Sequence, residues 1–112
     1  MVKKKYILDR GDIIWVDFNP TRGHEQSGVR PAVVVSPVRY NSLSTMVLAC
    51  PITTRHKGYF FEVEITGLPE KSFVLTDQIR SIDIKERIQK HRGSVSPDEM
   101  LDIIAKLSVL LQ

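Results

Sequence analysis

The pattern of hydrophobic and polar residues along the chain predicts a series of short β-strands. Residues 13–18 and 46–52 are runs rich in β-branched, aromatic and other apolar side chains. Residues 31–36 are almost wholly apolar, which favours a strand buried on both faces. Residues 59–66 alternate between apolar and polar side chains, and a fifth run follows over 72–79. Five strands separated by turns and one long loop predict a mainly β fold, a small antiparallel barrel.

The C-terminal segment has a helical period instead. Ser96, Pro97 and Glu99 form a capping box with proline at the first helical position. The apolar stripe that follows has helical spacing and consists of Met100, Ile103, Ile104, Leu107, Leu110 and Leu111. Leu101 and Val109 broaden it. We expect the helix to cover the open end of the barrel, and a second subunit could cover the rest of the stripe.

Length and composition narrow the class of protein. The chain has 112 residues, 42% hydrophobic and 26% charged, which predicts one globular domain over residues 1–112. No apolar run approaches the roughly 20 residues of a membrane-spanning helix, and the basic start lacks the apolar core of a signal peptide. We therefore expect a cytoplasmic protein without a membrane partner. Cys50 is the single cysteine, which excludes an intramolecular disulfide and a four-thiolate zinc site.

Positive charge is concentrated in one part of the sequence. Residues 19–59 contain five Lys or Arg and one acid, a balance of +4, whereas the rest of the chain has eleven bases and twelve acids, a balance of −1. The whole excess of the net charge of +3 therefore lies in this segment. An anionic partner is one interpretation of this asymmetry, and a solvated basic face is the other.

The long polar loop over residues 19–30 carries groups suited to phosphate chemistry. Polar loops of this length are uncommon in small domains and are often functional. Metal-free RNA cleavage needs a proton acceptor, a proton donor and cations that stabilise charge on phosphorus. Arg30 offers a fork that matches phosphate oxygens, His24 titrates near neutrality and Glu25 can accept a proton. An ordinary surface loop is the alternative.

Two further polar clusters follow the third and fifth predicted strands. Residues 53–59 hold two hydroxyls, two fixed cations and an aromatic ring, a set that can bind a phosphate and stack a base, or simply form a basic hairpin loop. Asp77, Gln78 and Arg80 end the fifth strand. Gln78 could read a base edge, whereas an Asp77–Arg80 pair could be structural. The three histidines lack metal-ligand spacing and no Gly-rich phosphate loop occurs, so we expect neither a metal nor a cofactor.

Longer strings in the sequence resemble a known family. They are GDIIWVDFNPTRGHEQSGVRPAVVVSP at 11–37, PITT at 51–54, KGYFFEV at 57–63 and LTDQIRSID at 75–83. Together they are similar to the MazF/PemK family of toxin endoribonucleases, and most of all to its MazF branch. The likeness covers nearly the whole chain in order, which makes it far more specific than any single motif.

The resemblance implies a fold and an activity. It implies an SH3-like barrel that forms a homodimer, with an RNA site near the subunit interface. It also implies cleavage of single-stranded RNA, especially mRNA, without a metal or the ribosome, at short sites for which an ACA-like triplet is the first guess. A cognate antitoxin with a disordered acidic segment would cover that site, in keeping with the basic segment 19–59.

The resemblance also assigns roles to individual residues. It implies that Arg30 and Thr53 carry catalysis, with Glu25 in support, while the roles of Asp77 and Gln78 are less fixed. Because arginine is always charged, we expect Arg30 to act on the developing phosphate charge rather than as a proton carrier. His24 is expected to assist without being required. The expected RNA contacts are Thr54, Arg55, Lys57, Asp77, Gln78 and Arg80.

Two other functions are compatible with such a barrel. Related toxins with this type of barrel grip gyrase and cleave nothing, so the fold alone does not decide between them. A module that binds RNA without turnover would keep the basic loops but not the chemistry. The Arg30 and Thr53 pair favours cleavage, because a gyrase poison would not be expected to need it.

Overall fold

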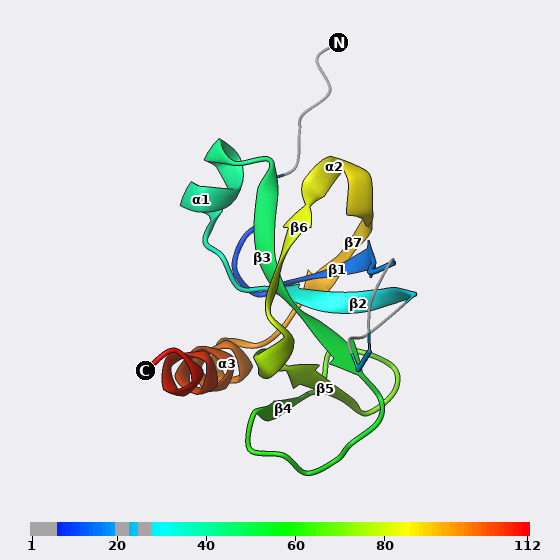
Figure 1. Ribbon diagram of the computed structural model, residues 1–112, viewed down its shortest axis with the longest axis vertical. Helices are drawn as coiled ribbons and strands as arrows, with labels where there is room; N and C mark the ends of the chain where they lie inside the picture. The colour runs from blue at the N-terminus through cyan, green and yellow to red at the C-terminus, as the bar shows by residue number, and fades with distance from the viewer. Residues whose placement is uncertain (1–6, 20–22, 25–27) are drawn as a thin grey trace.

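The structure, a computed structural model, describes residues 7–19, 23–24 and 28–112 (Figure 1). Seven strands form one curved antiparallel sheet in the order β4-β5-β3-β2-β1-β7, and β6 pairs with β3 beside β5. The strands are β1 Asp12–Asp17, β2 Val29–Val34, β3 Met46–Thr53, β4 Glu62–Ile65, β5 Ser72–Leu75, β6 Arg80–Asp83 and β7 Ile88–Ser94. The sheet curls into a barrel-like shape that does not close. The predicted mainly β fold with a C-terminal helix is confirmed.

Four helical segments accompany the sheet: α1 Val38–Leu43, the 3₁₀ turn η1 Thr76–Gln78, α2 Ile84–Arg87 and α3 Pro97–Leu110. The capping box of α3 is present as predicted. The Ser96 hydroxyl accepts from the Glu99 N–H at 3.1 Å, and the Glu99 carboxylate accepts from the Ser96 N–H at 2.8 Å. Within the described ranges, no helix is long and apolar enough to cross a membrane.

Glu99 also fastens α3 to the sheet. Its second oxygen accepts from the Thr66 N–H at 2.8 Å, at the end of β4. Burial opposes ionisation of this carboxyl, but the hydrogen bonds from Ser96 and Thr66 outweigh it and lower its pKa. One carboxylate therefore both caps the helix and places its first turn beside β4.

The inner part of the α3 stripe docks on the sheet, and the outer part does not. Ile103 and Leu107 are buried, and Met100 and Ile104 pack partly against the same cluster. The two residues that broaden the stripe, Leu101 and Val109, remain 69% and 50% exposed. The predicted packing of α3 on its own barrel is thus confirmed for one face of the helix.

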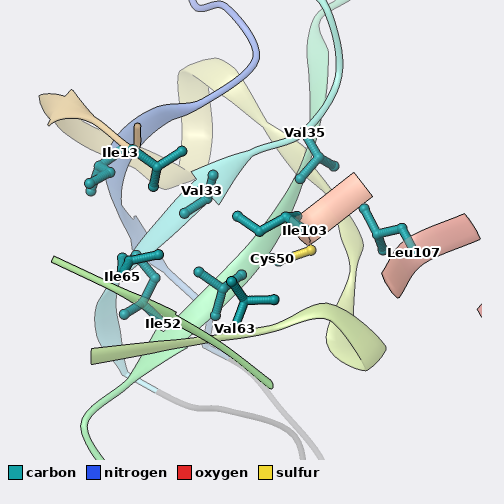
Figure 2. Close-up of a cluster of buried hydrophobic side chains, with 11 residues drawn as sticks. Ile13, Val33, Val35, Cys50, Ile52, Val63, Ile65, Ile103 and Leu107 are labelled. Atoms are coloured by element: carbon teal, nitrogen blue, oxygen red, sulfur yellow. The ribbon is translucent and has the colours of Figure 1, made fainter. Parts of the chain in front are cut away.

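Hydrophobic side chains lie on both faces of the sheet. The helix-side cluster lies beneath α3 and contains Ile13, Val33, Val35, Cys50, Ile52, Val63, Ile65, Val74, Val95, Ile103 and Leu107 (Figure 2). The far-side cluster contains Leu8, Ile14, Val16, Phe18, Ala32, Val34, Val47, Ala49 and Ile82. Successive residues of β2 and β3 enter opposite clusters, which confirms that the run at 31–36 is buried on both faces.

Several elements differ from the sequence-based expectation. The predicted strand at 59–66 is shorter, because residues 59–61 belong to the loop before β4, and the run at 72–79 leaves the strand after Leu75 to form η1. The helices α1 and α2 and the strands β6 and β7 were not predicted. In β7 six of seven residues are exposed, so it has no apolar periodicity to detect.

Candidate active site

Arg30 and Thr53 lie on the same face of neighbouring strands. The β2–β3 pairing ends at Ala32 and Pro51, and each site residue lies two positions beyond that pair, Arg30 on β2 and Thr53 on β3. Directly opposite residues of an antiparallel pair share a face of the sheet. Arg30 also pairs with Val16 of β1, a far-side cluster residue, so both site residues lie on that face, beyond the edge of its apolar cluster.

Thr53 is held tightly where β3 ends. It is 5% exposed, and it pairs with Phe73 of β5 on its other side. The Arg55 N–H donates to its hydroxyl oxygen at 3.1 Å, which turns the chain out of the strand. Because that bond uses only a lone pair, the hydroxyl keeps its own hydrogen for donation to another acceptor.

Arg80 joins the same face from β6. It pairs with Ala49 of β3, and its guanidinium carbon lies 5.6 Å from the centre of the Phe18 ring. In the described part of the chain, no ion pair joins Asp77 to Arg80. The aromatic contact therefore orients this cation in place of the carboxylate suggested by the sequence.

Asp77 and Gln78 lie in η1, which is tied to the loop before β4. The buried Thr76 hydroxyl donates to the Phe61 carbonyl at 2.6 Å, and the Thr76 N–H donates to the same oxygen at 3.3 Å. Desolvation raises the pKa of the Asp77 carboxyl, the Glu62 charge adds to that rise, and a backbone hydrogen bond opposes it. Asp77 is thus shifted in the direction that a proton-carrying carboxyl requires.

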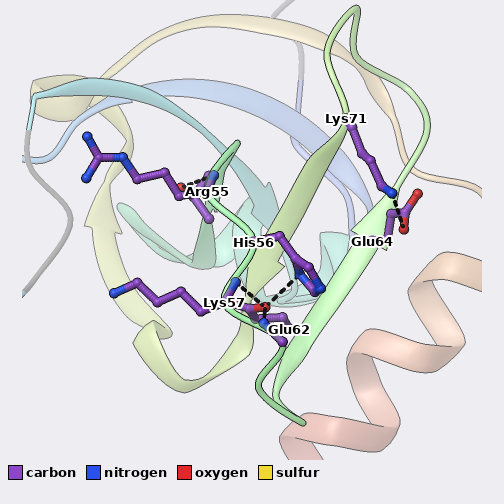
Figure 3. Close-up of polar contacts among 8 residues, drawn as sticks. Arg55, His56, Lys57, Glu62, Glu64 and Lys71 are labelled. Atoms are coloured by element: carbon purple, nitrogen blue, oxygen red, sulfur yellow. Dashed lines mark hydrogen bonds and ion pairs between the residues drawn. The ribbon is translucent and has the colours of Figure 1, made fainter.

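The loop between β3 and β4, residues 54–61, carries the predicted phosphate ligands. Thr54, Arg55 and Lys57 are exposed and follow directly from Thr53. Figure 3 shows Arg55 and Lys57 on this loop. His56 stacks on Phe73 with ring centres 4.3 Å apart and an interplanar angle of 20°. Since Phe73 pairs with Thr53, this stacking lays the loop over the face that carries Thr53. We call this face of β3, β4 and β5 the loop side.

Glu62 is a residue of this region that the sequence analysis did not single out. Alternation places it on the polar face of β4, together with Glu64, yet its side chain is only 2% exposed. The Lys57 and Gly58 N–H groups and His56 Nδ1 surround its carboxylate. No local pattern marks it, because the groups that bury it come from a folded-back loop.

The remaining predicted residues come from the long loop before β2. His24 is exposed at a turn, and Glu25 lies outside the described residues. The structure therefore brings Thr53 and the 54–57 segment together on the loop side and places Arg30 on the same face of the sheet from β2, without locating Glu25. Asp77 lies in η1, where the nearby Glu62 charge contributes to its raised pKa. Among the residues that it describes, no group of three His, Cys, Asp or Glu side chains converges as a metal site.

The open barrel brings arginine, a threonine hydroxyl and the cations of the 54–61 loop to one side of the sheet. This combination of donors and positive charge defines a small β protein suited to an anionic ligand. The model of PemK-like, MazF-like toxins of type II toxin-antitoxin systems matches residues 9–111. The chain belongs to this family.

Individual relatives extend the likeness over the full length. The endoribonuclease toxin MazF of Escherichia coli strain K12 is 48% identical over 107 residues, 96% of each chain. The crystal structure of MazF from Deinococcus radiodurans has a TM-score of 0.84 at 39% identity, covering 96% of this chain and 98% of that one. A MazE–MazF structure from the same organism has a TM-score of 0.78 at 35% identity, covering 95% and 97%.

Proposed function

We propose that residues 1–112 form a single toxin domain that cleaves single-stranded mRNA in the cytoplasm and thereby inhibits translation and growth. The observation that carries this proposal is that Arg30 and Thr53 lie on the same face of neighbouring strands, beside a cationic loop. The likeness to a relative named endoribonuclease toxin MazF supports the same activity. Cleavage occurs at short sequences and requires neither a metal ion nor the ribosome.

The reaction is an attack of the ribose 2′-oxygen on the adjacent phosphorus. The bond from phosphorus to the 5′-oxygen breaks, leaving a 2′,3′-cyclic phosphate and a 5′-hydroxyl. Arg30 stabilises the negative charge that builds on the phosphoryl oxygens, because its guanidinium stays charged at every relevant pH. Thr53 donates its remaining hydrogen to a phosphate oxygen and orients the group for attack.

Proton transfer requires groups other than Arg30. Glu25 acts in support, and His24 assists without being required. Asp77 is the third candidate, since its raised pKa brings a carboxyl closer to the pH at which it can exchange protons. Around this centre Thr54, Arg55, Lys57, Gln78 and Arg80 contact the phosphates and bases of the RNA.

Two protein partners belong to the proposal. A cognate antitoxin inserts an acidic, disordered segment over the basic site, and the MazE–MazF structures of relatives support such a partner. A second copy of the chain forms the homodimer. The exposed apolar side chains of α3, Leu101 and Val109 among them, support it, because such a wide stripe is seldom left to solvent.

The test is incubation of purified protein with a long single-stranded RNA in EDTA, with fragment ends mapped by primer extension. Wild type, Arg30→Ala and Thr53→Ala run in parallel. Discrete cuts by wild type alone are the expected result, and they also reveal the recognition sequence. A folded wild-type protein that leaves the RNA intact would contradict the proposal.

A further inference from the structure

The carboxylate of Glu62 is buried in an unusual setting. Its side chain is 2% exposed at the start of β4, a strand at the edge of the sheet. Burying a carboxylate is costly unless hydrogen bonds and nearby positive charge compensate for the lost water. The groups that compensate it are therefore informative about what the residue does.

All of these groups come from three consecutive residues of one loop. The Gly58 N–H donates to Glu62 Oε1 at 2.9 Å, and the Lys57 N–H lies 3.2 and 3.3 Å from the two oxygens. His56 Nδ1 lies 3.1 Å from Oε1 (Figure 3). Gly58 adopts a φ of 78°, a conformation that glycine permits without strain and that turns the chain around the carboxylate.

The same loop is also held by β5, the strand that pairs with β3 at Thr53. The His56 ring lies between Glu62 and the Phe73 ring, and Phe73 is the cross-strand partner of Thr53. A continuous path of contacts thus runs from Thr53 through Phe73 and His56 to Glu62. Arg55 and Lys57 flank His56 in sequence, so the position of both cations depends on this clamp.

We propose that Glu62 is a positioning residue for RNA cleavage: it fixes residues 56–58 so that Arg55 and Lys57 present their charges beside Thr53. This inference rests on the proposed endoribonuclease function. Glu62 itself does not touch RNA, because its carboxylate is enclosed by the loop. The apolar packing of β4 uses Val63 and Ile65 on the opposite face, so the carboxylate has no part in the helix-side cluster.

Glu64 provides a matched control. It lies two residues further along β4 on the same face, but its side chain is 51% exposed, and its ion pair with Lys71 spans 3.8 Å. Glu62→Gln and Glu64→Gln make the same chemical change on one strand. Only the first removes the charge that the 56–58 segment encloses.

The experiment uses a short RNA oligonucleotide that contains the cut site mapped with the long RNA. In Glu62→Gln we expect KM to rise about tenfold with kcat changed by less than about threefold, because misplaced cations weaken phosphate binding. We expect amide hydrogen exchange at Lys57 and Gly58 to accelerate. Glu64→Gln should match wild type in KM, kcat and exchange. A folded Glu62→Gln protein with wild-type KM would overturn the proposal.

A double-mutant cycle separates positioning from a general structural role. Arg55→Ala raises KM in wild type, and it should raise KM much less in the Glu62→Gln background, where Arg55 is already misplaced. Equal effects in both backgrounds would contradict the proposal. If Glu62→Gln does not fold, His56→Ala replaces it, since His56 is 57% exposed and supplies one of the three loop groups.

His56→Ala then tests the proposal by the same two measurements, KM and amide hydrogen exchange. A rise in KM together with faster exchange at Gly58 supports the clamp, and unchanged values of both overturn it. Failure of the proposed function has a different signature, because wild type would then cut no RNA at all.

Discussion

Alternate residues of β3 face the helix side and the loop side, and the two sides of the strand have different surroundings. Cys50 and Ile52 lie under α3, in a cluster closed by Ile103 and Leu107. Thr53, one residue further, is buried on the opposite face, where a loop stacks His56 on Phe73 and no helix of the described residues covers it. A helix covers a sheet with apolar side chains, whereas a loop brings backbone N–H groups and charges. The candidate site thus lies where the cover of the sheet changes from helix to loop.

Replacing Arg30 should have the largest effect of these variants, and the effect should be on the cleavage rate and not on stability. Arg30→Ala should lower the cleavage rate by about 10² to 10³-fold, the usual cost of losing one group that stabilises transition-state charge. Cleavage of the mapped oligonucleotide measures this loss, and thermal unfolding should remain close to wild type. A large drop in stability, with the rate per folded molecule unchanged, would place Arg30 in the structure rather than in the chemistry.

Replacing Ile103 tests the helix side through the same two quantities, stability and cleavage rate. Ile103 is fully buried, and Ile103→Ala should lower the free energy of unfolding by about 2–5 kcal/mol through lost burial and a cavity. Urea denaturation measures it. The rate per folded molecule should stay near wild type. A fall in the rate per folded molecule without a loss of stability would contradict this assignment of Ile103.

The ionisation of Glu99, on the helix side, predicts that part of the protein's stability depends on pH. Its pKa is lowered from an ordinary 4.5, so the folded state favours the charged form. Its contribution to stability is then present above pH 4.5 and is lost as the pH falls through the folded-state pKa. Glu99→Gln should therefore be less stable than wild type at neutral pH, with a gap that narrows in acid. Urea denaturation across this range measures the gap, and a gap of the same size at neutral pH and in acid would contradict the assignment.

The ionisation of Asp77, in η1, predicts a pH dependence of stability with the opposite sign and the smallest effect. Its pKa is raised from an ordinary 3.8, so the folded state disfavours its charge and stability rises as the pH falls through the shifted pKa. Asp77→Asn should be slightly more stable than wild type at neutral pH and indistinguishable from it in acid. Unfolding midpoints from pH 3 to 7 would contradict this if the variant were the weaker protein at pH 7.

The sequence predicts the parts of the fold that have a period. The alternation of Val63 and Ile65 and the helical spacing of Ile103 and Leu107 both lead to the observed helix-side cluster. It misses α1, because this short helix is anchored by polar contacts. Asn41 is its one buried residue and donates to the carbonyls of Leu8 at 2.7 Å and Ser36 at 3.0 Å. Polar anchors leave no apolar pattern in the sequence.

The residues of the candidate site also divide into those that the sequence predicts and those that it does not. Arg30 and Thr53 follow from the strings that resemble the family, and the alternation of β2 and β3 then places them on one face of the sheet. Glu62 does not follow, because its environment depends on the long-range packing of His56 on Phe73. The sequence left open a structural pair of Arg80 with Asp77, whereas the structure places the Arg80 guanidinium over Phe18, a residue far away in sequence. Contacts between distant segments are what local sequence patterns leave undetermined.

The openness of the barrel has a consequence for aggregation. An unclosed sheet leaves strand edges unpaired, and an exposed strand edge can pair with another chain and start a fibre. Within the described residues β4, β6 and β7 each pair on one side only, and β6 has only four residues. β4 has only four residues, two of them glutamates. β7 is longer, but its pairing with β1 shifts register twice, and Lys90 and Arg92 are exposed along it. Short, irregular and charged edges resist strand addition, so the open barrel is protected against forming fibres at high concentration.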